Sequence, residues 1–280
     1  MIHQRNLSLL SNRLAQSGGR RIVEAVLERD YCLAWFLVGL SRSALRDDLI
    51  FKGGTALKRC YLGEYRFSED LDFTLAEPRE LKEILAEING ICEEVQRASG
   101  IAFRFARADR RGHKNCHTFF LAYEGPLPAG SPKEVKIDIT ISEHLVCPVE
   151  KRPILRGYEE YTDLPEKEFI RVYSLDEIAV EKLVALTDKA RNEPRDLYDL
   201  WYLSSEKLVD IAMLIPEIER KLSSRGRTPN TMLRELAVKE TLYKKLWTGR
   251  LSRQMSKLPP FEDVFRATLR TLRKAKVVTR

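Results

Sequence analysis

Three aspartates stand on two stretches in which apolar and polar residues alternate. Asp70 and Asp72 flank a leucine in DLDFTL (residues 70–75), and Asp138 lies in EVKIDITI (residues 134–141). On a strand, Asp70 and Asp72 point to one face with their backbones roughly 6.5–7 Å apart. If the two strands are neighbours, three carboxylates meet, and close pairs repel by about 4 kcal/mol. Such a cluster needs a cation, and all-oxygen ligands select Mg²⁺ or Mn²⁺. The alternative is a pair of solvated acids on an edge strand.

A glycine pair precedes these aspartates. Gly53-Gly54-Thr55 follows a short apolar segment, DLIFK (residues 48–52), and begins a helical one. Glycines let a ligand approach the backbone closely, and the free N–H groups at a helix start favour an anion such as phosphate. The same residues would serve equally in a plain tight turn. No GxxxxGK[ST] sequence occurs, so the segment is not a Walker A loop.

Alternating strand and helix patterns must position these residues. The predicted strands are residues 48–52, 70–75, 101–106, 118–123, 134–141 and 168–173. The predicted helices are residues 20–40, 81–98, 175–189, 195–203, 207–222, 231–247 and 261–274. The pattern indicates an α/β (α+β) fold class: a mixed sheet with flanking helices in residues 1–173, followed by a helical domain in residues 174–280.

Composition excludes several classes of protein. The 280 residues are 44% hydrophobic and 32% charged, which excludes a disordered chain. The longest apolar run, Tyr31–Leu40, is too short to cross a bilayer and predicts a buried core helix. The first residues lack the apolar stretch of a signal peptide. We therefore expect a cytoplasmic protein with no membrane partner. The five cysteines form no CxxC pair, so no zinc ribbon is indicated.

Positive charge is concentrated at the C-terminal end. The chain has a net charge of +7, yet residues 220–280 contain 17 Lys and Arg against 4 Asp and Glu. A basic segment on an acidic body favours a polyanionic partner, and the charge is equally compatible with RNA, DNA or a nucleotide. The alternatives are a solvated surface or a docking face for an acidic protein.

Four segments together resemble a known family. They are FKGGTALKRCYLGEYRFSEDLDFTL (residues 51–75), EVKIDIT (134–140), SLDEIAVEKLVAL (174–186) and RDLYDL (195–200). In this order they resemble the motifs of the AbiEii toxin family of nucleotidyltransferases, within the DNA polymerase β superfamily. The resemblance implies a polymerase-β-like nucleotidyltransferase sheet. The last 80 residues carry none of these motifs.

The resemblance also implies roles for individual residues. The β- and γ-phosphates of an NTP are expected at Gly53, Gly54 and Thr55. The metal is expected at Asp70, Asp72 and Asp138, with Asp138 also helping to deprotonate the acceptor hydroxyl. Lys182 is expected to contact the triphosphate, and Asp196 to lie near the nucleotide or acceptor. The alternative is that Lys182 is a solvated lysine on the surface of a helix.

Three further residues are secondary candidates. Arg66 and Ser68 either order the loop before Asp70 or contact phosphate, and Lys189 is a second-choice phosphate ligand. The expected activity is metal-dependent transfer of an NMP from an NTP to an acceptor hydroxyl, at an RNA or tRNA 3′ end. By resemblance the protein is the toxin of a type IV toxin–antitoxin pair with a cognate antitoxin. The alternatives are transfer to a small molecule or protein side chain, or a catalytically silent nucleic-acid-binding regulator.

Overall fold

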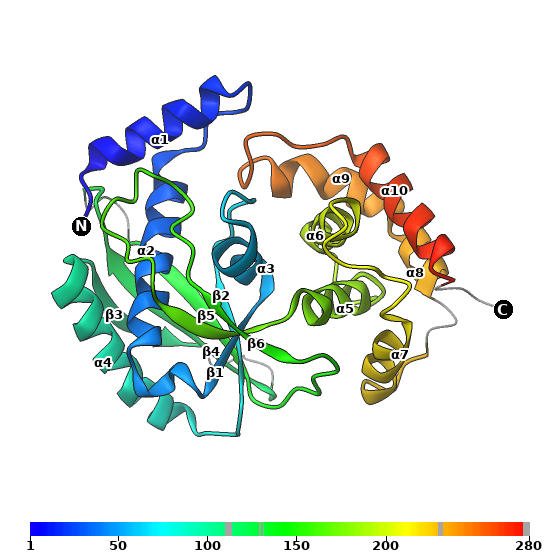
Figure 1. Cartoon of the computed structure of the whole chain (residues 1–280), viewed down its shortest axis with the longest axis horizontal. Coiled ribbons are helices and arrows are strands. Elements are labelled where there is room, and N and C mark those ends of the chain that lie inside the picture. The colour runs from blue at the N-terminus through cyan, green and yellow to red at the C-terminus, as the bar shows by residue number, and fades with distance from the viewer. Residues whose placement is uncertain (110–113, 129, 131, 229–231, 277–280) are drawn as a thin grey trace. The chain divides into compact units, whose positions relative to one another are not determined.

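The structure, a computed structural model, describes residues 1–109, 114–128, 130, 132–228 and 232–276 (Figure 1). The chain divides into two compact units. Unit 1 comprises Met1–Glu143 and Val149–Val172, and unit 2 comprises His144–Pro148 and Tyr173–Arg280.

A mixed sheet organises unit 1. Within the described residues it has seven strands in the order β3-β4-β5-β2-β1-β7-β6. The strands are β1 (Leu49–Lys52), β2 (Leu71–Leu75), β3 (Ala102–Ala108), β4 (Cys116–Glu124), β5 (Glu134–Thr140), β6 (Val149–Pro153) and β7 (Phe169–Tyr173). β2 runs parallel to β5 and antiparallel to β1, while β4 runs antiparallel to β3 and β5. The mixed α/β sheet predicted from the sequence is thus confirmed.

Helices cover the apolar face of this sheet. α2 (Glu24–Ser41) packs against α4 (Leu81–Ser99), and Figure 1 shows α4 beside β3, which it contacts. Phe36 of α2 meets Phe103 of β3 with 5.6 Å between ring centroids. Burying a side chain of this size stabilises the fold by about 1.5–3 kcal/mol. The same face carries the buried residues Leu71, Phe73, Ile137 and Ile139. Alternation therefore sends the polar residues of β2 and β5 to the opposite face.

Buried cations anchor the helical segment that follows the glycine pair. α3 (Gly53–Ala56) continues as a π-helix over Leu57–Leu62. Arg59 is fully buried and pairs with Asp30 at 2.5 Å. The Lys58 ammonium donates to two backbone oxygens and, at 2.9 Å, to the Tyr158 hydroxyl, and burial lowers its pKa to about 8. These bonds fix the segment that connects β1 to β2.

Unit 2 is helical, as predicted. Its helices are α5 (Leu175–Leu186), α6 (Pro194–Ser205), α7 (Ile215–Ser224), α8 (Met232–Val238), α9 (Glu240–Leu251) and α10 (Phe261–Lys274). α5 packs on α6 and α7, and α6 also packs on α9 and α10. The ring of Trp247 contacts the rings of Tyr198 and Phe261 in the core. Among the described residues, no helix combines the length and apolar character needed to cross a membrane.

Two predicted helices of unit 2 differ from the structure. The helix predicted over residues 207–222 is wrong in its first half, because Lys207 adopts a positive φ of 56° and α7 begins only at Ile215. The Leu208 amide donates to the Leu203 carbonyl at 2.9 Å, which closes the end of α6. The helix predicted over residues 231–247 consists of α8 and α9, and its first residue lies outside the described residues.

Candidate active site

Four polar side chains form a row across the polar face of the sheet. Asp72 of β2 stands opposite Asp138 of β5 in the strand register. Lys52 of β1 stands opposite Asp72, and Thr118 of β4 stands opposite Asp138. Positions directly opposite on neighbouring strands have their side chains about 5 Å apart. The two strands that sequence analysis singled out are therefore neighbours, with two of the three predicted carboxylates in register.

Both oxygens of Asp138 have hydrogen-bond donors. The Thr118 hydroxyl donates to Oδ1 at 2.6 Å, and the Lys136 ammonium donates to Oδ2 at 2.5 Å. Burial lowers the pKa of Lys136, but the hydrogen bond to Asp138 and the charges of Asp138, Asp70 and Asp72 outweigh it, so the pKa is raised overall. Lys136 and Thr118 were not predicted as site residues from the sequence. The signal for Lys136 was its period-two spacing from Asp138 on the polar face.

Asp70 lies just outside β2. The strand begins at Leu71, so the predicted strand 70–75 is one residue too long, and Asp70 and Asp72 are not a pair within one strand. The Thr55 hydroxyl donates to the backbone oxygen of Asp70 at 2.6 Å, which ties α3 to the start of β2. The charge of Asp70 nevertheless acts on Lys136, so the three aspartates belong to one electrostatic neighbourhood.

The glycine pair lies between an acidic and a basic side chain. Gly53 has a positive φ of 80°, and a Cβ added there would lie 2.6 Å from Asp72 Oδ2. A Cβ on Gly54 would lie 2.5 Å from a terminal nitrogen of Arg66. Arg66 is 2% exposed and Ser68 is 7% exposed, so both belong to the packed loop before Asp70. Only glycine allows the turn to approach both side chains this closely.

The contact at Gly53 yields a prediction. We expect Gly53→Ala to destabilise unit 1 by about 1–2 kcal/mol, because its left-handed backbone disfavours a Cβ. We also expect it to displace Asp72 and lower any metal-dependent activity. Gly90→Ala is the matched control: an added Cβ there meets no atom within 4 Å in helix α4. Thermal unfolding of the two variants measures the difference, and equal stability would contradict the close approach.

The donor set fits a hard divalent cation. Among the described residues, no three His, Cys, Asp or Glu side chains already gather closely enough to hold a metal. Asp72 and Asp138 nevertheless supply carboxylate oxygens in register on neighbouring strands, which is the ligand chemistry that Mg²⁺ and Mn²⁺ prefer. Asp138 Oδ2 already holds a cation, the ammonium of Lys136. A positively charged side chain of the protein therefore already lies at this carboxylate oxygen.

Unit 2 contains two further predicted site residues, Lys182 and Asp196, in a buried ion cluster. Lys182 of α5 lies 2.7 Å from Asp196 and 2.7 Å from Asp199, both on α6. Arg191 also pairs with Asp196, at 2.6 Å. Burial alone would raise the pKa of Asp196, but Lys182 and Arg191 outweigh it and lower that pKa. Lys182 is thus 7% exposed and held by carboxylates, whereas Lys189 is exposed after α5.

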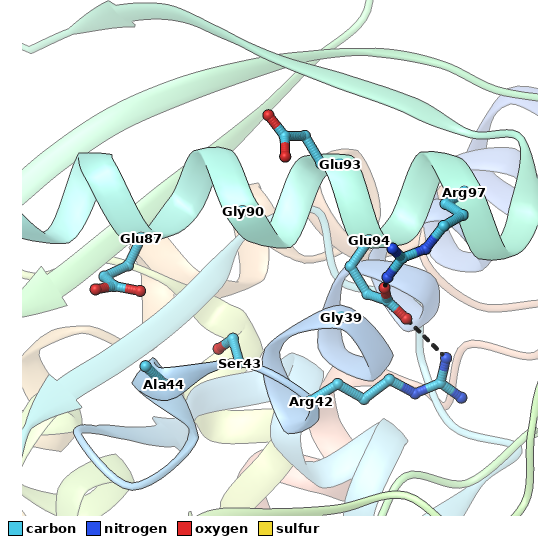
Figure 2. Close-up of a pocket in the computed structure, with 9 residues that line it drawn as sticks. All are labelled: Gly39, Arg42, Ser43, Ala44, Glu87, Gly90, Glu93, Glu94 and Arg97. Atoms are coloured by element: carbon cyan, nitrogen blue, oxygen red, sulfur yellow. Dashed lines mark hydrogen bonds and ion pairs between the residues drawn. The ribbon is translucent and has the colours of Figure 1, made fainter.

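A pocket of about 440 Å³ opens between the C-terminal end of α2 and the middle of α4 (Figure 2). Charged side chains line it, including Arg42, Glu87, Glu93 and Arg97. Figure 2 shows Arg42 in an ion pair with Glu94, and the distance is 3.2 Å. Because α2 and α4 cover the apolar face of the sheet, the pocket is separate from the row of Asp72 and Asp138.

Comparisons with known proteins agree with this fold. The model of the family described as nucleotidyl transferase AbiEii toxin, type IV TA system, matches residues 35–270. The chain therefore belongs to this family of nucleotidyltransferase toxins. The MenT4 nucleotidyltransferase toxin of Mycobacterium tuberculosis is similar in structure, with a TM-score of 0.59 and 21% identity over 95% of this chain and 87% of that chain.

A second solved structure shares the fold. It is a protein of H. pylori assigned as a nucleotidyltransferase, with a TM-score of 0.55 and 16% identity. The similarity covers 91% of this chain and 96% of that chain. A search of curated protein sequences gave no significant match. The family and the fold thus define a nucleotidyltransferase.

Proposed function

We propose that this nucleotidyltransferase transfers an NMP from an NTP to an acceptor hydroxyl and releases pyrophosphate, with Mg²⁺ or Mn²⁺ as cofactor. The observation that carries the proposal is the register of Asp72 opposite Asp138, beside the Gly53-Gly54 turn. The carboxylates that would hold the metal are Asp70, Asp72 and Asp138. Bound there, the metal would neutralise the charge of the triphosphate.

The remaining residues of unit 1 would orient the substrate. The backbone of Gly53 and Gly54, with the Thr55 hydroxyl, would hold the β- and γ-phosphates. The guanidinium of Arg66 lies close to Gly54, and its positive charge beside the turn supports this role. Ser68, in the same loop, is a further candidate for this role. The Asp138 carboxylate would help to accept the proton of the acceptor hydroxyl. Positioning and charge neutralisation would thus supply most of the catalysis.

Residues of the helical domain are further candidates for the reaction. We assign residues 1–173 to the catalytic domain and residues 174–280 to a helical domain that contributes Lys182 and the RDLYDL segment. In the present structure Lys182 is bound by Asp196 and Asp199, so contact with a triphosphate would require the ammonium to exchange or share these partners. Lys189, which is exposed, remains the second candidate for a phosphate contact.

The proposed acceptor is RNA, with a tRNA 3′ end as the specific case. Some of the basic residues in the C-terminal segment are buried and bind groups of the protein itself. Lys221 pairs with Glu177 at 2.8 Å, and Lys239 donates to the Arg191 carbonyl at 2.7 Å. Other basic residues line the exposed side of α10, the red helix of Figure 1. They are Arg266, Arg270, Arg273 and Lys274. Within the described residues, these four side chains make no hydrogen bond or ion pair, which supports an external anionic partner.

The α10 stripe gives a testable prediction. We expect the double reversal Arg270→Glu with Arg273→Glu to weaken RNA binding and to flatten its salt dependence. Losing two phosphate contacts should make the slope of log affinity against log salt shallower by roughly 1.4–1.8. The matched control is Lys82→Glu with Lys151→Glu, which removes the same charge from exposed positions of unit 1. Binding titrations at several salt concentrations measure both.

Two results would redirect the acceptor assignment. Equal RNA affinity and equal salt slopes in the two double variants would contradict docking on α10. RNA-independent turnover that is insensitive to salt would instead favour transfer to a small molecule or a protein side chain. We also propose that a cognate antitoxin restrains the enzyme in the cytoplasm, consistent with its type IV toxin family.

A further inference from the structure

Lys136 lies beside Asp138 on the polar face of the sheet in unit 1. Strand alternation places it on the same side of β5 as Asp138, two residues away. Its ammonium lies 2.5 Å from Asp138 Oδ2. Asp72 stands opposite Asp138 in the parallel register, and the charges of Asp70 and Asp72 also act on Lys136. The Lys136 ammonium therefore contacts one of the three carboxylates expected to bind a metal and interacts with the charges of the other two.

The position of the ammonium has a direct consequence for a divalent cation. The other oxygen of Asp138 accepts the Thr118 hydroxyl at 2.6 Å, so neither oxygen of this carboxylate lacks a donor. A metal that bonds to Oδ2 must displace Lys136, since two cations cannot share that oxygen at contact distance without strong repulsion. The side chain of Lys136 is 37% exposed, so the ammonium can swing into solvent when it is displaced.

We propose that Lys136 is an internal counter-ion that holds the carboxylates together in the metal-free protein and competes with the divalent cation for Asp138. This inference rests on the proposed function, in which Asp72 and Asp138 hold the metal. It assigns to Lys136 a positioning role that sets the metal concentration at which the enzyme becomes active. A lysine at this position lowers metal affinity, and in exchange it keeps the empty site free of unbalanced negative charge.

Removal of the ammonium provides the test. Mn²⁺ alone is titrated into the full-length protein, and free Mn²⁺ is measured by electron paramagnetic resonance. We expect Lys136→Met to bind Mn²⁺ at least about tenfold more tightly than the wild type, equivalent to about 1.4 kcal/mol. Lys136→Arg, which keeps the charge, should bind like the wild type. Lys151→Met removes one charge from an exposed position of β6 and should also leave binding unchanged.

The outcomes separate this inference from the proposed function. If the wild type binds Mn²⁺ and Lys136→Met binds no more tightly, the counter-ion role is wrong and the metal site stands. If no variant binds Mn²⁺, both proposals fail. An equal gain in Lys151→Met would show a general charge effect and would also overturn the inference.

A measurement on the wild type covers the case in which Lys136→Met does not fold. Displacement of the ammonium predicts that Mg²⁺ makes Lys136 react faster with an amine-acetylating reagent, relative to Lys151 in the same sample, as quantified by mass spectrometry. Unchanged or slower acetylation of Lys136 at saturating Mg²⁺ would contradict displacement.

Discussion

Asp138→Ala and Asp72→Ala should each reduce nucleotidyl transfer by about a hundredfold to a thousandfold while leaving the fold intact. Loss of a group that stabilises charge in the reacting complex costs this much in other enzymes. Asp138 is a half-buried residue on the polar face of β5, so its removal opens no cavity in the apolar core. Removing one of two facing carboxylates also relieves repulsion between Asp72 and Asp138.

The matched control for these variants is Asp47→Ala, which removes an exposed carboxylate from the same unit. Transfer of label from an NTP and thermal unfolding are measured for all three variants. Near-normal transfer by Asp138→Ala would show that the assignment of the metal ligands is wrong. Loss of folding in either site variant would instead indicate a structural role.

Lys182→Ala should have two large effects. Its removal takes an ion-pair partner from two buried carboxylates, those of Asp196 and Asp199, so we expect a loss of stability of about 3–5 kcal/mol. We also expect the Michaelis constant for NTP to rise more than that for the acceptor. Lys189→Ala, which alters an exposed lysine nearby, should change stability little.

A double variant separates the two effects of Lys182. Adding Asp199→Asn to Lys182→Ala removes one of the two buried negative charges that Lys182 pairs with, and it should recover much of the stability. If Lys182 acts on the triphosphate, the defect in NTP use remains after stability is restored. Full recovery of NTP use in the double variant would show that Lys182 has only a structural role, in which its ion pairs link α5 to α6.

The sequence predicted the structure best for strands in which only one face is buried. β5 alternates fully between buried and half-buried residues, and its polar positions predicted the face on which Asp138 lies. The sequence alone could not establish that β2 pairs with β5, because strand order depends on contacts between distant segments. The register of Asp72 opposite Asp138 therefore required the structure.

Other features depended on tertiary contacts that leave little local pattern. α1 (Gln4–Gln16) and β6 were not predicted, since α1 is stabilised by packing on α2 and β6 has no strong alternation. The break at Lys239 accompanies its bonds to backbone carbonyls of the turn after α5. Burial of Lys221 and Lys239 could likewise not be read from charge counts, so the sequence overestimated the basic surface.

The most direct test of the central claim follows the α-phosphate of the NTP. The protein is incubated with each α-labelled NTP, Mg²⁺ and total RNA, in parallel with γ-labelled NTP and with the Asp72→Ala variant. The account predicts that α-label becomes covalently attached to RNA, that γ-label is released as pyrophosphate, and that both depend on Mg²⁺ and Asp72. Absence of α-label from every acceptor pool, or undiminished transfer by Asp72→Ala, would contradict it.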